Sequence, residues 1–249
     1  MWKRWGLPVL LAGMIGITGC GFAMKEGKRE LELPAQSIET LQVDTASGDF
    51  TIKGDDQADS IRAVATIRSA QGAEDKAVVF TLEKDGKTAK LASRFKSEFG
   101  FNNRSMDITV TVPSKLNVTV DDESGDLHIS DIQGDVSIID QSGDMVVKGV
   151  QGKIEIKDQS GDIELTGSSG DVKIDDQSGD MKIRNHTGDV TINDESGEIE
   201  LRDINGSVVI DDESGDIIIR GVEKDVTIRS DGSGGVEVSD VKGSYTNKE

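Results

Sequence analysis

Residues 158–179 read DQSGDIELTGSSGDVKIDDQSG, and this unit of two similar halves repeats with a period of 18 residues. Apolar residues stand two places apart in each half, as Ile163 and Leu165 do in the first and Val172 and Ile174 in the second. Such alternation is typical of β-strands, and a fixed short repeat is typical of solenoids. The sequence therefore predicts an all-β fold, a single-chain parallel β-solenoid (β-helix) with two short strands per 18-residue coil.

Glycines mark the turns between these strands. They recur every nine residues without a gap, at Gly125, Gly134, Gly143, Gly152, Gly161, Gly170, Gly179, Gly188, Gly197, Gly206 and Gly215. At one corner of the coil, the residue three places before the glycine, or before Lys224 in the last coil, is always one that tolerates a left-handed backbone. These residues are Asp131, Gly149, Gly167, Asn185, Asp203 and Gly221. This corner requires only a backbone conformation, since glycine has no side chain with which to bind a ligand.

The other corner keeps carboxylates in every coil, in the pattern Asp-Gln/Glu-Ser-Gly-Asp. We call it the acidic seam. Its members are Asp122, Asp126, Asp140, Asp144, Asp158, Asp162, Asp176, Asp180, Asp194, Glu198, Asp212 and Asp216. Like charges about 4.8 Å apart on neighbouring coils repel each other by roughly 1 kcal/mol even in water. The seam therefore needs a compensating interaction.

Two compensating interactions fit the seam. In the favoured one, each Asp accepts hydrogen bonds from N–H groups of the turn and from the adjacent Ser, so no cofactor is required. In the alternative, Ca²⁺ binds between coils, since it favours carboxylate and carbonyl oxygens. The seam resembles the calcium-binding nonapeptide β-roll in its periods of nine and eighteen. It departs from that family in having one glycine per nonapeptide and, by our interpretation, no acids at the alternate corner.

The chain begins with the basic segment Met1-Trp2-Lys3-Arg4-Trp5, followed by an apolar run from Gly6 to Ile17. That run is too short to span a bilayer and has the form of a signal-peptide core. It ends in Ile17-Thr18-Gly19-Cys20, which resembles the bacterial lipobox. The resemblance implies cleavage before Cys20, lipid on its thiol, and an exported, membrane-anchored lipoprotein on the outer membrane or periplasmic side if the host is Gram-negative.

The sequence divides into a lipoprotein signal peptide (1–19), a lipidated Cys and tether (20–30), an N-terminal coil with capping strands (31–121) and the regular array (122–249). Alternation predicts strands over 38–45, 61–68, 78–82, 106–112 and 116–120, with a turn at Asp85-Gly86. We interpret 31–121 as an opening coil with antiparallel strands inserted into it, which would cap the end of the stack. Within it, Phe95, Phe99 and Phe101 either pack this cap or form a loop that binds a partner.

The histidines and the net charge limit the functional classes. His128 and His186 lie more than three coils apart, so they cannot share a site. The net charge of −19 disfavours binding to nucleic acid or anionic lipid, which leaves lipid on Cys20 as the membrane contact. Without residues 1–19 the chain has no Trp and a single Tyr, Tyr245. Enzymes that act on polysaccharides bind sugars on aromatic platforms, so this composition disfavours such an enzyme.

The chain resembles a bacterial family of uncharacterised β-strand-repeat domains labelled "putative adhesin". The resemblance rests on Thr45-Ala46-Ser47-Gly48-Asp49, on Val110-Thr111-Val112-Pro113 and on the Ser-Gly-Asp turns. It implies a non-catalytic, lipid-anchored envelope solenoid that binds a protein partner or serves as a scaffold. The alternatives are a calcium-binding envelope module that uses the seam and, less favoured, a β-helical enzyme acting on polysaccharide.

Overall fold

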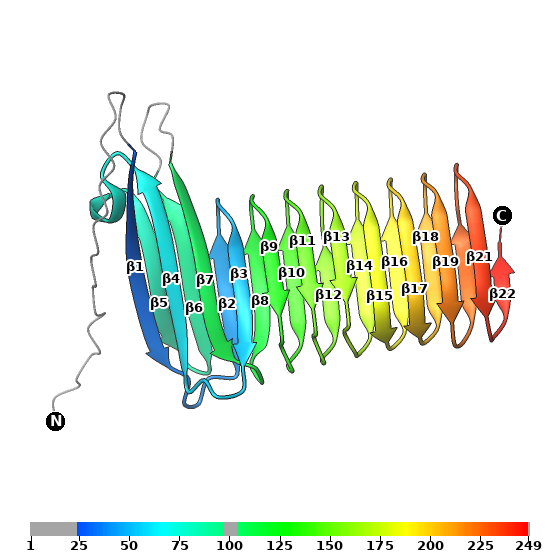
Figure 1. The fold of residues 1–249 in the computed structure, drawn as a ribbon, viewed down its shortest axis with the longest axis horizontal. Helices are drawn as coiled ribbons and strands as arrows, with labels where there is room; N and C mark the ends of the chain where they lie inside the picture. Colours follow the sequence, from blue (N-terminus) through cyan, green and yellow to red (C-terminus); the bar gives the residue numbers. More distant parts are fainter. Residues whose placement is uncertain (1–23, 97–103, 249) are drawn as a thin grey trace.

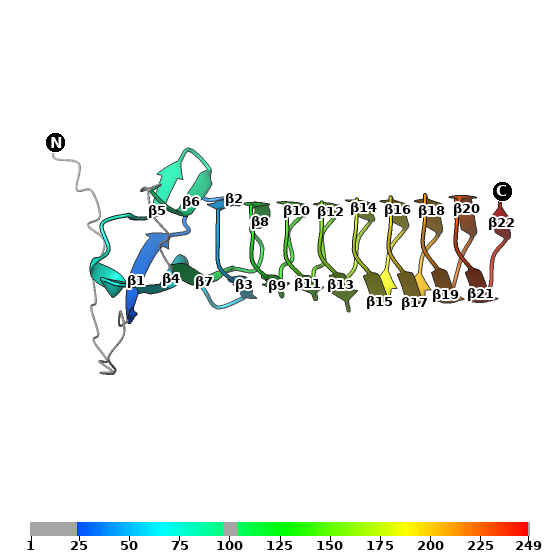
Figure 2. The ribbon, with the colours of Figure 1, turned by 90° about the horizontal axis from the view of Figure 1, so that it is seen from above.

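The structure is a computed structural model that describes residues 24–96 and 104–248. Its strands form two sheets of eleven that face each other over one continuous core (Figure 1, Figure 2). The first sheet has the order β1 (Lys25–Pro34), β4 (Ser60–Ser69), β7 (Ser105–Pro113), β3 (Phe50–Asp55), β9 (Leu127–Ser130), β11 (Met145–Lys148), β13 (Ile163–Thr166), β15 (Met181–Thr187), β17 (Ile199–Asn205), β19 (Ile217–Val222), β21 (Val236–Val241).

The second sheet runs alongside it. Its order is β22 (Tyr245–Asn247), β20 (Val226–Ser230), β18 (Val208–Asp212), β16 (Val190–Asp194), β14 (Val172–Asp176), β12 (Ile154–Lys157), β10 (Val136–Asp140), β8 (Asn117–Asp122), β2 (Thr40–Thr45), β6 (Thr88–Phe95), β5 (Val78–Asp85). A 3₁₀ turn, η1 (Gly72–Glu74), lies at the N-terminal end.

The array confirms the predicted parallel solenoid. From β8 onward, odd and even strands alternate between the sheets, and each pairs in parallel with the strand one coil away. Ile163 lies opposite Met181 and Val172 opposite Val190, a register of 18 residues. The inward residue at each of these positions is buried, so equivalent apolar side chains of successive coils form the core.

The N-terminal region confirms the predicted cap of inserted strands. β2 and β3 form an opening coil that pairs in parallel with β8 and β9, although residues 56–116 separate them in sequence. On their other side, β6 and β7 pair in parallel with β2 and β3. Antiparallel pairs of β1 with β4, β4 with β7 and β5 with β6 then close this end. The Asp85-Gly86 turn joins β5 to β6, with Gly86 at φ 61°.

Residues 25–30, which we expected in a tether, are the start of β1. This strand pairs with β4 over its full length. Its residues are mostly charged, and Glu30 and Glu26 form ion pairs with Arg62 and Arg68 of β4. A charged edge strand lacks the apolar alternation on which sequence-based strand prediction depends, but it protects a sheet edge from further pairing.

The C-terminal coils contain an irregularity in strand pairing. The pairing of β18 with β20 slips by one residue after Ile210, so that Asp211 lies opposite Ser230. This bulge accommodates one additional residue in β20, and stacking continues through β21 and β22.

Candidate functional site

The acidic seam contains two distinct rows of carboxylates. The inner row comprises Asp122, Asp140, Asp158, Asp176, Asp194 and Asp212, and the outer row comprises Asp126, Asp144, Asp162, Asp180, Glu198 and Asp216. Every inner-row residue is buried, with at most 3% of its surface exposed. In β10, Asp140 continues the buried phase of Val136 and Ile138, which places the inner row at the edge of the core.

Inner-row carboxylates hold the turns that follow the second sheet. Oδ1 of Asp176 accepts a hydrogen bond from the backbone N–H of Ser178 at 3.3 Å, and the turns at Asp122, Asp140, Asp194 and Asp212 have the same bond. The Ser178 hydroxyl donates to the carbonyl of Gln159 in the preceding coil, at 3.1 Å. The Asp therefore organises its own turn while the Ser joins consecutive turns, which supports the structural role predicted for the seam.

Outer-row carboxylates connect the coils. Oδ1 of Asp144 accepts from the backbone N–H of Asp162 at 3.1 Å, and Oδ1 of Asp162 accepts from that of Asp180 at 2.9 Å. The same contact runs from Glu198 to Asp180. These residues are exposed or half-buried, so water screens their mutual repulsion.

Only glycine fits between the two rows. Gly179 has φ 142°, and a Cβ added there would lie 1.9 Å from the carbonyl oxygen of Gly161 in the preceding coil. The other corner also has the expected left-handed backbone, with φ 60° at Asp131, 53° at Asn185 and 56° at Asp203. The glycines that recur every nine residues therefore allow close stacking at both corners, since a Cβ added at Gly206 of the opposite corner would lie 1.8 Å from the carbonyl oxygen of Gly188.

Our expectation that the alternate corner lacks acids is wrong. Asp135, Asp171, Asp189 and Asp225 occupy it, and their carboxylates accept backbone N–H bonds from the following coil. In the bond from Ser207 to Asp189 the N···O distance is 2.8 Å. Lys153 and Ser207 interrupt the row and hide it in the sequence. At both corners, carboxylates that follow the turn glycine therefore link successive coils by accepting backbone N–H bonds.

Burial changes the acid–base behaviour of the inner row. It raises the pKa of Asp122, Asp158 and Asp194 to about 7 and that of Asp176 and Asp212 to about 6, and it also raises the pKa of Asp140. In each case loss of water around the charged form is the largest cause. Oδ2 of every inner-row Asp is buried without a hydrogen-bond partner.

The described residues show no set of calcium ligands at the seam. Within residues 24–96 and 104–248, no three His, Cys, Asp or Glu side chains are grouped so that they could hold a metal ion. Calcium takes six to eight oxygen ligands. Here one oxygen of each inner Asp is bonded in its turn and the other is sealed from solvent, while outer Asp oxygens accept backbone N–H groups. Each corner's carboxylates are thus already used by the fold.

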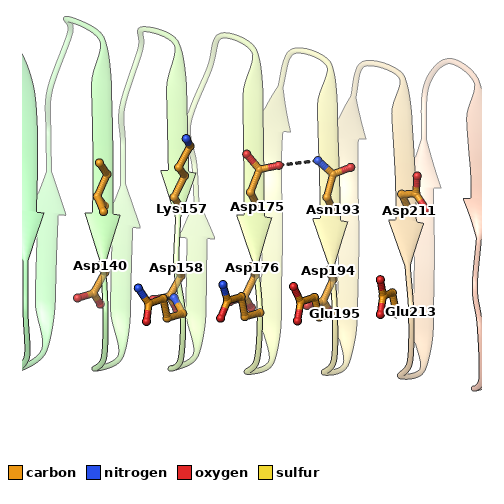
Figure 3. Close-up of a pocket in the computed structure, with 13 residues that line it drawn as sticks. Asp140, Lys157, Asp158, Asp175, Asp176, Asn193, Asp194, Glu195, Asp211 and Glu213 are labelled. Atoms are coloured by element: carbon orange, nitrogen blue, oxygen red, sulfur yellow. Dashed lines mark hydrogen bonds between the residues drawn. The ribbon is translucent and has the colours of Figure 1, made fainter.

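An open groove of about 630 Å³ runs beside the seam on the outside of the second sheet (Figure 3). One wall is the outward row Ile139, Lys157, Asp175, Asn193 and Asp211, and the other is the corner row Gln159, Gln177, Glu195 and Glu213. The Asn193 amide donates to Asp175 at 2.5 Å, and Lys173 forms an ion pair with Asp175. The groove crosses five successive coils, from β10 to β18.

The first sheet carries one buried acid on its outward side. Glu200 of β17 forms ion pairs with Arg184 on the neighbouring strand and with Arg202, and bonding to Arg184 lowers its pKa. Lys182 lies between Glu164 and Glu200 in register. These pairs stabilise the sheet and offer no reactive group.

The remaining predicted residues are separate from the seam. Phe95, at the end of β6, is half-buried with the Arg104 guanidinium 5.8 Å from its ring centre, whereas Phe99, Phe101 and Cys20 lie outside the described residues. His128 is exposed on β9, and His186 is buried in β15, directly after the left-handed residue Asn185. No helix in the described ranges is long and apolar enough to cross a membrane.

Comparison with known proteins identifies the fold. Residues 60–246 match the family described as Toastrack DUF4097, which confirms the β-strand-repeat resemblance. No curated protein matches the sequence. Among solved structures, one described as a "putative lipid binding protein" from Parabacteroides distasonis ATCC 8503 is 19% identical, covers 90% of this chain and 94% of its own, and has a TM-score of 0.53. A "putative adhesin" from the same strain is 14% identical, with 88% and 96% coverage and a TM-score of 0.52.

Proposed function

The chain belongs to the Toastrack DUF4097 family, and we propose that it is a non-catalytic, adhesin-like module that binds a protein partner along the outside of its solenoid. The groove beside the seam carries this proposal. It presents the same positions of five coils in line, so it suits a partner segment that lies extended along the stack. Its mixed walls, with Lys157, Asp175 and Asp211 on one side, suit a partner with complementary charges.

The neighbour described as an adhesin is consistent with this function for a solenoid of the same fold. Lipid binding, the description of the other neighbour, has less support here. Among the described residues the large apolar side chains that are exposed are Met24, Ile139 and Tyr245, which are scattered along the chain. A lipid would need a contiguous apolar surface.

We further propose that the module acts in the cell envelope, held at the membrane by lipid on Cys20. Its net charge of −19 is unsuited to adsorption on anionic lipid, so a covalent anchor would supply the attachment. The protein partner would then be another envelope or surface protein.

Binding of the purified, labelled chain to isolated envelopes tests the function. We expect saturable binding that protease treatment of the envelopes abolishes. Asp211→Lys, in the groove, should weaken binding by about tenfold or more, because a reversed charge in an interface costs at least about 1.4 kcal/mol.

The matched control is Glu164→Lys, which makes the same charge change at an exposed position of the first sheet. It should bind as the unmodified chain does. Equal loss in both variants would indicate nonspecific charge effects, and unsaturable or protease-resistant binding would contradict the proposal.

A further inference from the structure

The inner row is a continuous buried column of carboxyl groups. Asp122 pairs in register with Asp140, Asp176 with Asp194, and Asp194 with Asp212. Neighbouring parallel strands lie about 4.8 Å apart, so carboxyls within the row have another above and below them, whereas Asp122 at its start has one on one side only. The seam gives each of them one turn hydrogen bond, to Oδ1, and leaves Oδ2 enclosed without a partner.

Hydroxyl groups occupy the same place in the N-terminal coils. Thr45 of β2 lies in register with Asp122 on one side and with Ser93 of β6 on the other. Both hydroxyl residues are buried, and the Ser93 hydroxyl donates to Thr45 Oγ1 at 2.8 Å. The column position therefore accommodates O–H groups that donate along the axis, which is what a protonated Asp would present.

The charges around the column do not offset its own. The acids that act on it are Glu123 on Asp122, Asp162 and Glu195 on Asp176, and Glu213 and Asp231 on Asp212, besides the inner-row neighbours themselves. The first-sheet strand after each turn begins with a buried apolar residue, such as Ile163 or Met181. An ionised column would thus combine buried, unpaired charge with like-charge repulsion, an arrangement that proteins avoid by neutralising the group.

We propose that the inner row is a proton-binding site, a column of aspartates that takes up protons on folding. Each bound proton neutralises one carboxylate and places an O–H where Oδ2 has no other partner. The column thereby makes the stability of the solenoid respond to pH.

The sign of the response follows from linkage. An Asp in the unfolded chain has a pKa of 3.8, whereas burial raises the pKa to about 6 for Asp176 and Asp212 and to about 7 for Asp122, Asp158 and Asp194. Between these values the folded state binds more protons than the unfolded state, so unfolding becomes easier as pH rises. The contribution is fully present below pH 3.8 and is lost as pH rises through the range from about 6 to 7.

Thermal unfolding of the full chain at constant ionic strength tests the proposal. We expect the midpoint to fall by at least about 5 °C between about pH 5.5 and about pH 8.5. The triple variant Asp158→Asn/Asp176→Asn/Asp194→Asn removes three adjacent titrating groups and should lose most of that slope. The amide oxygen of each introduced Asn can still accept the hydrogen bond from the backbone N–H of its turn.

The matched control is Asp144→Asn/Asp162→Asn/Asp180→Asn, which removes the same number of charges from neighbouring coils of the outer row. Because both histidines are retained throughout, any contribution from them is common to all three proteins. The outer-row variant should keep the slope of the unmodified chain. A flat profile in the unmodified chain, or equal slopes in both variants, would overturn the proposal.

A direct titration covers the case in which the inner-row variant does not fold. Carbon-13 NMR of the Asp carboxyl carbons in the unmodified chain should show a group of signals that titrate at least about two pH units above the ordinary Asp value. Single Asp176→Asn should remove one of them. Titration of all Asp signals in the ordinary range would contradict the column.

Discussion

Asp176 and Asp194 occupy the same place on neighbouring strands, paired in register, and each has one carboxyl oxygen that is buried without a hydrogen-bond partner. In this fold a short repeat fixes every position, so a residue that faces inward in one coil faces inward in all of them. A repeated Asp therefore forms a buried column of carboxyl groups. A repeated glycine, which has no side chain, lets the backbones of successive turns lie close together.

Gly179→Ala should destabilise the chain by at least about 3 kcal/mol in denaturant unfolding, because the new Cβ would collide with a backbone oxygen that cannot move independently. A Cβ there would lie 1.9 Å from the Gly161 oxygen. Gly167→Ala is the control. Its φ is 64° with no atom within 4 Å of the added Cβ, so its cost should be only about 1 kcal/mol. Similar losses for both would show that stacking at the seam is looser than the structure implies.

His186→Ile should stabilise the chain, and more so at acidic pH. Burial lowers the pKa of His186, and neither ring nitrogen makes a hydrogen bond of normal geometry. Ile132 and Ile204 hold the same corner place in other coils, so the pocket accepts the side chain. A gain of about 1 to 2 kcal/mol is expected near neutrality from removal of a buried unsatisfied group.

The pH dependence distinguishes this effect from packing. A His with a lowered folded pKa contributes stability above its unfolded value of 6.5 that is lost as pH falls through the folded value. The advantage of His186→Ile should therefore grow below pH 6.5, opposite in sign to the column. The exposed His128→Gln should change stability by less than about 0.5 kcal/mol.

The sequence allows the array to be predicted because every core position is repeated. Pairs such as Val172 and Ile174 show the strand phase in each coil, and the exchange of Gly167 with Asn185 and Asp203 shows the left-handed corner. β1 could not be predicted in this way, since its charged side chains on an edge strand carry no apolar period. Its strand state comes from pairing with β4, a contact between distant residues.

The two acidic rows could be seen in the sequence, but their different environments could not. An Asp after a strand is ordinarily expected in solvent. A signal was nevertheless present, because Val136, Ile138 and Asp140 continue one alternation and Thr45 holds the column position in the opening coil. The row of acids at the alternate corner was missed because Lys153 and Ser207 interrupt it in the sequence. In the structure the remaining acids still accept backbone N–H bonds from the following coil.

Calcium should leave the unfolding midpoint unchanged relative to a chelator, within about 1 °C. Ligand binding to the folded state raises stability by RT ln(1 + [L]/Kd), so millimolar Ca²⁺ would shift the midpoint measurably at any site with a Kd well below that concentration. The described residues hold no group of three His, Cys, Asp or Glu side chains placed to bind a metal ion. A saturable rise with Ca²⁺ but not Mg²⁺ would restore the calcium hypothesis, and its loss in the outer-row variant would locate the site.

Cys20→Ser should abolish lipid attachment and release the protein from membranes. The lipobox-like Ile17-Thr18-Gly19-Cys20 places the only cysteine of the chain where a diacylglycerol would be added. Each buried CH₂ of an acyl chain contributes about 0.8 kcal/mol, so several chains give an anchor that salt does not disturb.

Incorporation of labelled palmitate tests lipid attachment, and fractionation of cells tests membrane association. The unmodified protein should remain with membranes in high salt and leave them in detergent. Thr18→Ser, which keeps a small residue before the cysteine, serves as the control and should be labelled normally. Persistent labelling of Cys20→Ser, or release of the unmodified protein by salt alone, would refute the anchor.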